Sequence, residues 1–197
     1  MTQREIRGGI PAEVRADDDG VRVAGYAAVF NEEADIMGLF RERIAPGAFR
    51  DAIGRDDVVF LVNHEGLPLA RTRSGTLTLK EDERGLYIET ELDAEDPDVR
   101  AIVGKMRRGD LDKMSFAFRA DKQEWDDTQE PPVRTISQAS LFDVSVVTSP
   151  AYEGTEIGLR SLEEARKAVR RHNFDMVQRR KELMLARASR SGLLFGQ

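Results

Sequence analysis

Residues 114–121 read MSFAFRAD, a run in which large apolar and small side chains alternate. Successive side chains of a β-strand point to opposite faces. The alternation therefore predicts a strand that turns Phe116 and Phe118 toward a core and Ser115 away from it. Small side chains on the outer face leave room for another group to approach the Ser115 hydroxyl.

A second run of this kind lies at residues 141–148, LFDVSVVT. Val144 and Val146 share one face of the expected strand, while Asp143 and Ser145 share the other. This strand also places polar side chains opposite a core-facing apolar row.

The rest of the first 160 residues contains further strand patterns and few helical ones. Asp96 followed by Pro97 predicts a helix start, because an acidic N-cap and a proline in the first turn are both favoured there. Gly109 predicts the end of that helix. The fold class expected is α+β and mainly β, an antiparallel barrel or sandwich with one or two inserted helices. The additional strands are expected at residues 21–30, 58–64, 76–80, 86–92 and 135–138.

The composition limits the classes of protein to consider. The chain has 197 residues, of which 40% are hydrophobic and 34% charged, enough for one domain with an appendage. It has no cysteine, which excludes disulfides, thiolate metal ligands and a cysteine nucleophile. No apolar run reaches the roughly 20 residues that cross a bilayer, and residues 1–20 lack the apolar stretch of a signal peptide. We therefore expect a cytoplasmic protein without a membrane partner.

The charge is uneven along the chain. Residues 160–190 carry ten Lys/Arg and four Asp/Glu, a local net charge of +6 in a chain of net charge −6. From about residue 161 to 188 the apolar residues follow a helical spacing. This basic helix either is a solvated surface or binds an acidic partner, such as another copy of the chain. The rest of the chain is acidic, which does not suggest that it binds nucleic acid. The expected domains are a flexible segment at 1–20, the β-rich body at 21–158, and a basic helix with a flexible tail at 159–197.

Three residues of the body could together activate a serine. His64 ends a predicted strand, and an imidazole is the natural base for a serine hydroxyl such as that of Ser115. Asp143 could orient the histidine through its second ring nitrogen. The other histidine, His172, stands among arginines on the basic helix, where a surface role is expected.

Several alternatives remain open from the residues alone. Ser145 is a rival nucleophile, because it occupies the same kind of strand face as Ser115. Lys113 shares a strand face with Ser115, so a Ser–Lys pair is also conceivable. Glu65 could replace Asp143 as the orienting acid.

Standard signatures of metal and nucleotide chemistry are absent. His64-Glu65 does not continue into a zinc-binding helix motif, since Pro68 stands where the second histidine would be. There is no G-x-S-x-G elbow, no Walker loop and no dinucleotide-binding glycine motif. We expect neither a metal nor a cofactor.

The order of several segments resembles the prohead serine proteases of tailed phages, over about residues 25–152. The resemblance implies a β-barrel surrounded by helices, as in the herpesvirus assemblin proteases. It also implies cleavage of scaffold and capsid-protein segments, and commonly self-cleavage. The segments that carry it are GYAAVF (25–30), RERIAPGAF (41–49), VVFLVNHEGLPLART (58–72), GTLTLKEDERGLYIETEL (75–92), MRRGDLDKMSFAF (106–118) and FDVSVVTSPAY (142–152).

Carried over by position, the family histidine falls on His64 and the family serine on Ser115. The family acid falls on Asp143, where glutamate is the expected residue. Phe116 and Ala117 depart from the glycine-containing pattern expected after the serine. In the turn that follows, the backbone amides of Ser149 and Ala151 could help to form an oxyanion hole, which Pro150 cannot do without an amide hydrogen.

The function expected is that of a serine endopeptidase that processes a phage scaffold or capsid precursor, and itself, during prohead maturation. Its partner would be the major capsid protein or scaffold precursor, with self-association as a further expectation. It would act in the host bacterial cytoplasm, inside the assembling prohead. The alternative is a scaffold or capsid-associated module that has the same barrel but does not cut.

Overall fold

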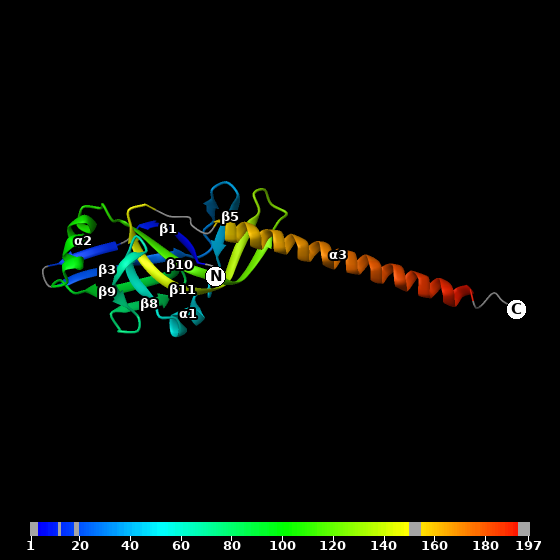
Figure 1. The fold of residues 1–197 in the computed structure, drawn as a ribbon, viewed down its shortest axis with the longest axis horizontal. Helices are drawn as coiled ribbons and strands as arrows, with labels where there is room; N and C mark the ends of the chain where they lie inside the picture. The colour runs from blue at the N-terminus through cyan, green and yellow to red at the C-terminus, as the bar shows by residue number, and fades with distance from the viewer. Residues whose placement is uncertain (1–3, 12, 18–19, 150–154, 193–197) are drawn as a thin grey trace. The chain divides into compact units, whose positions relative to one another are not determined.

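Two β-sheets build the body of the protein, whose computed structural model describes residues 4–11, 13–17, 20–149 and 155–192 (Figure 1). Contacts divide the chain into one unit at residues 1–155 and another at residues 156–197. The first unit holds both sheets and two short helices, α1 (Arg50–Arg55) and α2 (Pro97–Arg107). The fold is thus α+β and mainly β, with a helix at the C-terminal end.

The larger sheet is organised around a long antiparallel pair. In it β10 (Lys113–Asp126) pairs with β11 (Val133–Val147), and Figure 1 shows the two strands running side by side. On one side, β1 (Glu5–Pro11) pairs with β10. On the other side, β11 pairs in parallel with two shorter strands. One is β5 (Phe40–Ile44), which also pairs with β4 (Ala34–Ile36). The other is β6 (Val59–Val62), which also pairs with β7 (Glu65–Arg71).

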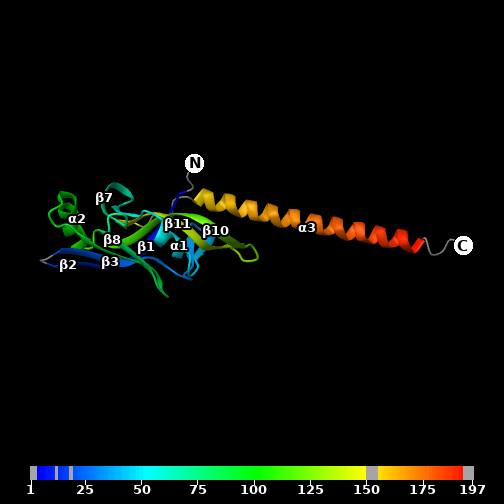
Figure 2. The same ribbon diagram turned by 90° about the horizontal axis from the view of Figure 1, so that it is seen from below.

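The smaller sheet is antiparallel throughout, and the core lies between it and the larger sheet (Figure 2). Buried side chains come from both sheets, including Val23 and Ile88 from the smaller one and Phe116 and Val144 from the larger one. The alternation read from residues 114–121 is confirmed, because Phe116 faces this core. The smaller sheet has the strand order β2 (Glu13–Asp17), β3 (Gly20–Val29), β9 (Gly85–Leu92) and β8 (Leu77–Glu81).

Helix α2 begins as its sequence predicts. The Asp96 side chain accepts a hydrogen bond from the backbone N–H of Asp98, and Pro97 stands in the first turn. Gly109 follows the helix with a positive φ of 81°, a conformation that glycine adopts without strain. The predicted start and end of this helix are both confirmed.

Two features of the body differ from the sequence prediction. The described strands form two open sheets, without a closed barrel, and β11 has two parallel neighbours where only antiparallel pairing was expected. Parallel pairing needs a long connection, and four strands and a helix lie between β6 and β11. Alternation within one strand does not reveal the direction of its partner, so the sequence could not predict these pairings.

The N-terminal segment also differs from the prediction. Residues 1–20 were expected to be flexible, yet β1 and β2 lie within them. Glu5, Ile6 and Arg7 are consecutive buried residues in β1, so the strand lacks an apolar and polar alternation. The charged side chains of this strand form ion pairs inside the protein. A prediction that depends on alternating apolar and polar residues therefore missed the strand.

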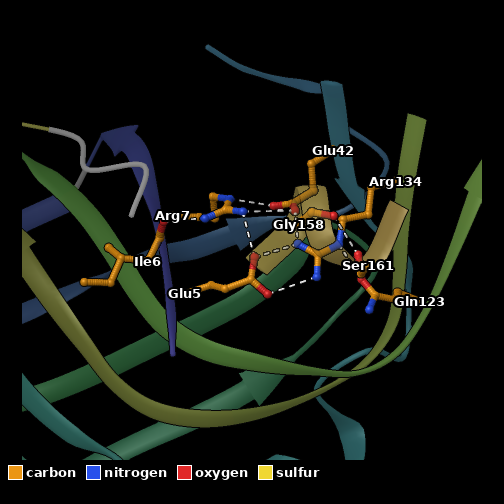
Figure 3. A network of polar contacts seen from close by, with 8 residues as sticks. All are labelled: Glu5, Ile6, Arg7, Glu42, Gln123, Arg134, Gly158 and Ser161. Atoms are coloured by element: carbon orange, nitrogen blue, oxygen red, sulfur yellow. Dashed lines mark hydrogen bonds and ion pairs between the residues drawn. The ribbon is translucent and has the colours of Figure 1, made fainter. Parts of the chain in front are cut away.

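Those charges form a buried network of two arginines and two glutamates (Figure 3). Arg134 donates to Glu5 at 2.6 Å and to Glu42 at 2.7 Å. Arg7 donates to Glu42 at 2.6 Å and to Glu5 at 3.0 Å. Burial alone would lower the pKa of Arg134, but hydrogen bonds and charges from the two glutamates outweigh it and leave that pKa raised. The network ties β1 to β5 and β11.

The second unit consists of most of α3 (Thr155–Gly192), which extends beyond the helix expected at residues 161–188. Taken by itself, the helix exposes several large apolar side chains. Among the described residues, no helix is both long and apolar enough to cross a membrane. Among the side chains of α3 that the structure describes, the large exposed apolar ones are Val169, Phe174, Met176, Val177, Leu183 and Met184.

The buried network makes Arg134 a sensitive position. Arg134→Met should lower the free energy of unfolding by about 3–5 kcal/mol, because Glu5 and Glu42 would each lose a buried partner. Urea denaturation measures this change. The matched control is Arg22→Met, which removes an exposed arginine paired with Glu89 and should leave the midpoint nearly unchanged. Equal midpoints for both variants would contradict the prediction.

Candidate active site

A two-residue turn between β6 and β7 holds His64. Val62 pairs with Glu65, and the two residues between them, Asn63 and His64, have positive φ angles of 51° and 62°. A tight hairpin turn of this kind needs left-handed residues at both positions, and asparagine tolerates that conformation better than histidine does. The turn therefore keeps His64 in a conformation that costs on the order of 1 kcal/mol or more.

Contacts with β11 hold this turn in place. The backbone N–H of Asn63 donates to the Val146 carbonyl at 2.9 Å. The Asn63 side chain accepts from the backbone N–H of Thr148 at 3.1 Å. The backbone N–H of His64 donates to the Ser145 hydroxyl at 3.2 Å. Parallel pairing of β6 with β11 brings the turn to these partners.

The pair of strands β10 and β11 supplies the other polar groups. Ser115 lies opposite Ser145, and Ala117 lies opposite Asp143. Directly opposed residues have their side chains on the same face of a sheet. The imidazole of His64 thus lies over a face on which two serines, an alanine and a carboxylate are gathered.

His64 joins Ser115 and Asp143 in one hydrogen-bonded chain. Its Nε2 atom lies 2.6 Å from the Ser115 Oγ, and its Nδ1 atom lies 2.5 Å from the Asp143 Oδ1. The side chains of His64 and Asp143 are only 6% and 4% exposed, and Ser115 is fully buried. A ring hydrogen on Nδ1 is donated to the carboxylate, which leaves Nε2 free to accept the serine proton. The structure therefore brings together all three residues singled out in the sequence.

The other residues considered in the sequence, Ser145, Glu65 and His172, do not take the place of Ser115, His64 or Asp143 in this chain. Ser145 is on the Nδ1 side, with its Oγ 3.3 Å from that nitrogen, whereas Ser115 faces Nε2. Ser115 contacts His64 and the Arg7 carbonyl, and Glu65 is exposed on the next strand. His172 lies on α3 with an exposed side chain.

A shallow cavity of about 220 Å³ opens beside His64. Ser149 is exposed at its rim, while Ala151 lies outside the described residues, so the oxyanion-hole assignment stays a prediction. In the described ranges, no three histidine or acidic side chains come together as metal ligands would. The cavity is lined by Arg4, Ile6, Asn63, His64, Glu65, Val147 and Ser149.

Strand β1 and Arg4, the residue before it, contribute contacts that the sequence did not predict. The Arg4 guanidinium lies 2.6 Å from the second carboxylate oxygen of Asp143. The Arg7 carbonyl lies 2.8 Å from the Ser115 Oγ and is a second acceptor for its single hydrogen. A Cβ atom added to Gly8 would lie 2.7 Å from the Ser115 Cβ, which is closer than two carbons can pack. The paired glycines at positions 8 and 9 were the one sequence signal for such a close backbone approach.

Comparison with known proteins identifies the family. The family model described as the caudovirus prohead serine protease matches residues 11–168. The chain belongs to this family. The resemblance noted in the sequence is thereby confirmed.

A curated relative is named "Prohead protease" and comes from Enterobacteria phage HK97. It is 32% identical over 148 residues, which cover 72% of this chain and 61% of the relative. The chain thus spans about three fifths of that protein's length. No solved structure matches, so the relation to the herpesvirus assemblin fold stays a prediction.

The close contact between Gly8 and Ser115 leaves no room for a larger side chain at position 8. Gly8→Ala should lower the free energy of unfolding by about 1–3 kcal/mol, because the added methyl group forces β1 away from β10. Thermal unfolding of the purified protein measures the change. Gly54→Ala is the control, since nothing lies within 4 Å of its added Cβ and alanine favours helix α1. A Gly8→Ala protein as stable as the control would show that β1 does not pack on Ser115.

Proposed function

We propose that the protein is a serine endopeptidase that cuts a phage capsid or scaffold precursor during prohead maturation. The observation that carries this proposal is the hydrogen-bonded chain from Ser115 through His64 to Asp143, at 2.6 and 2.5 Å. Membership of the prohead protease family supports the substrate class.

In the proposed reaction Ser115 is the nucleophile. Its Oγ attacks the carbonyl carbon of the peptide while Nε2 of His64 takes the hydroxyl proton. Asp143 accepts the Nδ1 hydrogen bond and stabilises the imidazolium that forms. The imidazolium then gives its proton to the leaving amine, which leaves an acyl group on Ser115. A water molecule, deprotonated by His64, releases that acyl group and restores the serine.

Access to Ser115 requires a local change at β1. The serine hydroxyl has one hydrogen, and the Arg7 carbonyl competes with Nε2 of His64 to accept it. With Ser115 fully buried, the described arrangement corresponds to a resting form. A substrate has to displace the Arg7 carbonyl, and the glycines at 8 and 9 are where the strand can yield. Gly9 has a positive φ of 124° at an irregularity in the β1–β10 register.

The buried serine also favours a second candidate, a structural module of the same fold that does not cut. Against it stands the alignment of a base and a carboxylate with the serine, which a purely structural protein does not need. The basic helix α3 would in either case bind an acidic partner in the shell, which is the role proposed for it here. Self-cleavage near the C-terminal end is part of the same proposal.

Replacing the nucleophile tests the reaction. Ser115→Ala should reduce processing of a co-expressed capsid precursor roughly a thousandfold or more, with the protein still folded. A double change of Ser115 and His64 should cost little more, because the two act as one unit. Mass spectrometry of both proteins identifies the cut ends. Undiminished processing by Ser115→Ala would exclude Ser115 as the nucleophile.

If His64 is the general base, the rate of peptide cleavage should depend on pH. Only a neutral imidazole can take the serine proton, so cleavage of a peptide substrate should be slow in acid and faster at higher pH. The His172→Ala variant should show the same profile, since that histidine is exposed on α3. Initial rates measured from acidic to mildly alkaline pH provide the test. A flat profile would count against His64 as the base.

A further inference from the structure

Ser145 is a buried polar residue that the proposed reaction does not use. It lies on β11 between Asp143 and the residues that hold the histidine turn, and its side chain is fully buried. Its hydroxyl has three neighbours within hydrogen-bond distance. These are the backbone nitrogen of His64 at 3.2 Å, Oδ1 of Asp143 at 3.2 Å and Nδ1 of His64 at 3.3 Å.

The chemistry of these neighbours permits one arrangement of hydrogens. The backbone N–H of His64 can only donate, so the Ser145 oxygen accepts there. The Nδ1 hydrogen of His64 points at Oδ1 of Asp143, 2.5 Å away, so Nδ1 has no free lone pair for the serine. The Ser145 hydrogen is therefore donated to Oδ1 of Asp143. That oxygen receives two hydrogen bonds, and Arg4 binds the other carboxylate oxygen.

We propose that Ser145 is a positioning residue, which fixes His64 and Asp143 relative to each other. This inference rests on the proposed protease function. Its hydroxyl holds the backbone of a histidine in a left-handed conformation and holds the carboxylate that orients the ring of the same histidine. Because it lies on the Nδ1 side of the imidazole, where the nitrogen carries a hydrogen, His64 cannot take its proton, and it is not a second nucleophile activated by that histidine.

Removal of the hydroxyl has a defined consequence. In Ser145→Ala the backbone N–H of His64 loses its acceptor and Oδ1 of Asp143 loses a donor. Of the backbone contacts that join the turn to β11, those of Asn63 then remain, and Arg4 can draw the carboxylate away from Nδ1. The imidazole would adopt a wider range of orientations, so that fewer of them direct Nε2 at Ser115.

A matched control exists on the same strand. Ser140 is also buried on β11, and its hydroxyl donates to the carboxylate of Asp121 at 2.6 Å. Burial acts to raise the pKa of Asp121, but hydrogen bonds from Ser140 and Arg119 outweigh it and hold that pKa below its usual value. Ser140→Ala therefore removes a serine-to-carboxylate hydrogen bond from β11 away from His64.

The experiment compares the full-length wild type, Ser145→Ala and Ser140→Ala on one peptide that contains a mapped cleavage site. For Ser145→Ala we expect kcat to fall roughly tenfold to hundredfold with KM little changed, the range known for groups that orient metal-ligating histidines. The pH profile should shift, because the hydrogen bonding of the imidazole has changed. Ser140→Ala should keep both kcat and the profile, even if its thermal stability falls as much.

A second readout does not depend on cleavage. The proton between Nδ1 of His64 and Asp143 should give a far-downfield NMR resonance in the wild type, assigned by its loss in His64→Ala. It should broaden or disappear in Ser145→Ala and persist in Ser140→Ala. An unchanged kcat, pH profile and resonance in Ser145→Ala would overturn the proposal. If Ser145→Ala abolishes cleavage while Ser115→Ala does not, Ser145 is the nucleophile and the positioning role is wrong.

The two readouts separate this inference from the function on which it rests. If the wild type cuts no capsid precursor or peptide, the proposed function fails. The NMR comparison of Ser145→Ala with Ser140→Ala then still supports or overturns the hydrogen bonding assigned to Ser145.

Discussion

The antiparallel ladder between β10 and β11 is the interaction on which the site depends. It places Ser115 opposite Ser145 and Ala117 opposite Asp143, so that a patch of small and acidic side chains lies on one face of the sheet. On the opposite face the same strands bury Phe116 and Val144 in the core. Each strand also pairs on its other edge, β10 with β1, and β11 with both β6 and β5. A slip of one residue in this ladder would exchange the two faces and remove the site.

The strands and the three candidate residues could be read from the sequence, but their partners could not. Alternation at residues 114–121 predicted the first part of β10, and Asp96-Pro97 predicted the start of α2. Residues 135–138 and 141–148 were expected as two strands, but both lie in the single strand β11. The pairing of His64 with Ser115 and Asp143 came from a family resemblance, because they are distant in the chain. The contacts of Arg4 and Gly8 were missed because residues 1–20 were expected to be flexible. The charged residues of this segment were interpreted as exposed, whereas Glu5 and Arg7 are buried.

Strand β1 faces two different environments. Its outward side gives the Arg7 carbonyl and Gly8 to Ser115, while its inward side gives Glu5 and Arg7 to the buried charge network. A movement of β1 that exposes Ser115 costs least if it leaves those ion pairs intact. A change confined to the glycines at 8 and 9 meets this condition, since neither carries a side chain into the network.

The charge network has a further consequence for how this sequence can diverge. Glu5, Arg7, Glu42 and Arg134 together sum to no net charge, so each is tolerated inside the protein only because the other three are present. Replacing one of the four leaves an unpaired charge in the interior, which lowers stability. Replacing all four by apolar side chains of similar volume can leave stability unchanged or raise it. Among related chains the four positions should therefore covary, either ionic together or apolar together, with few mixed intermediates.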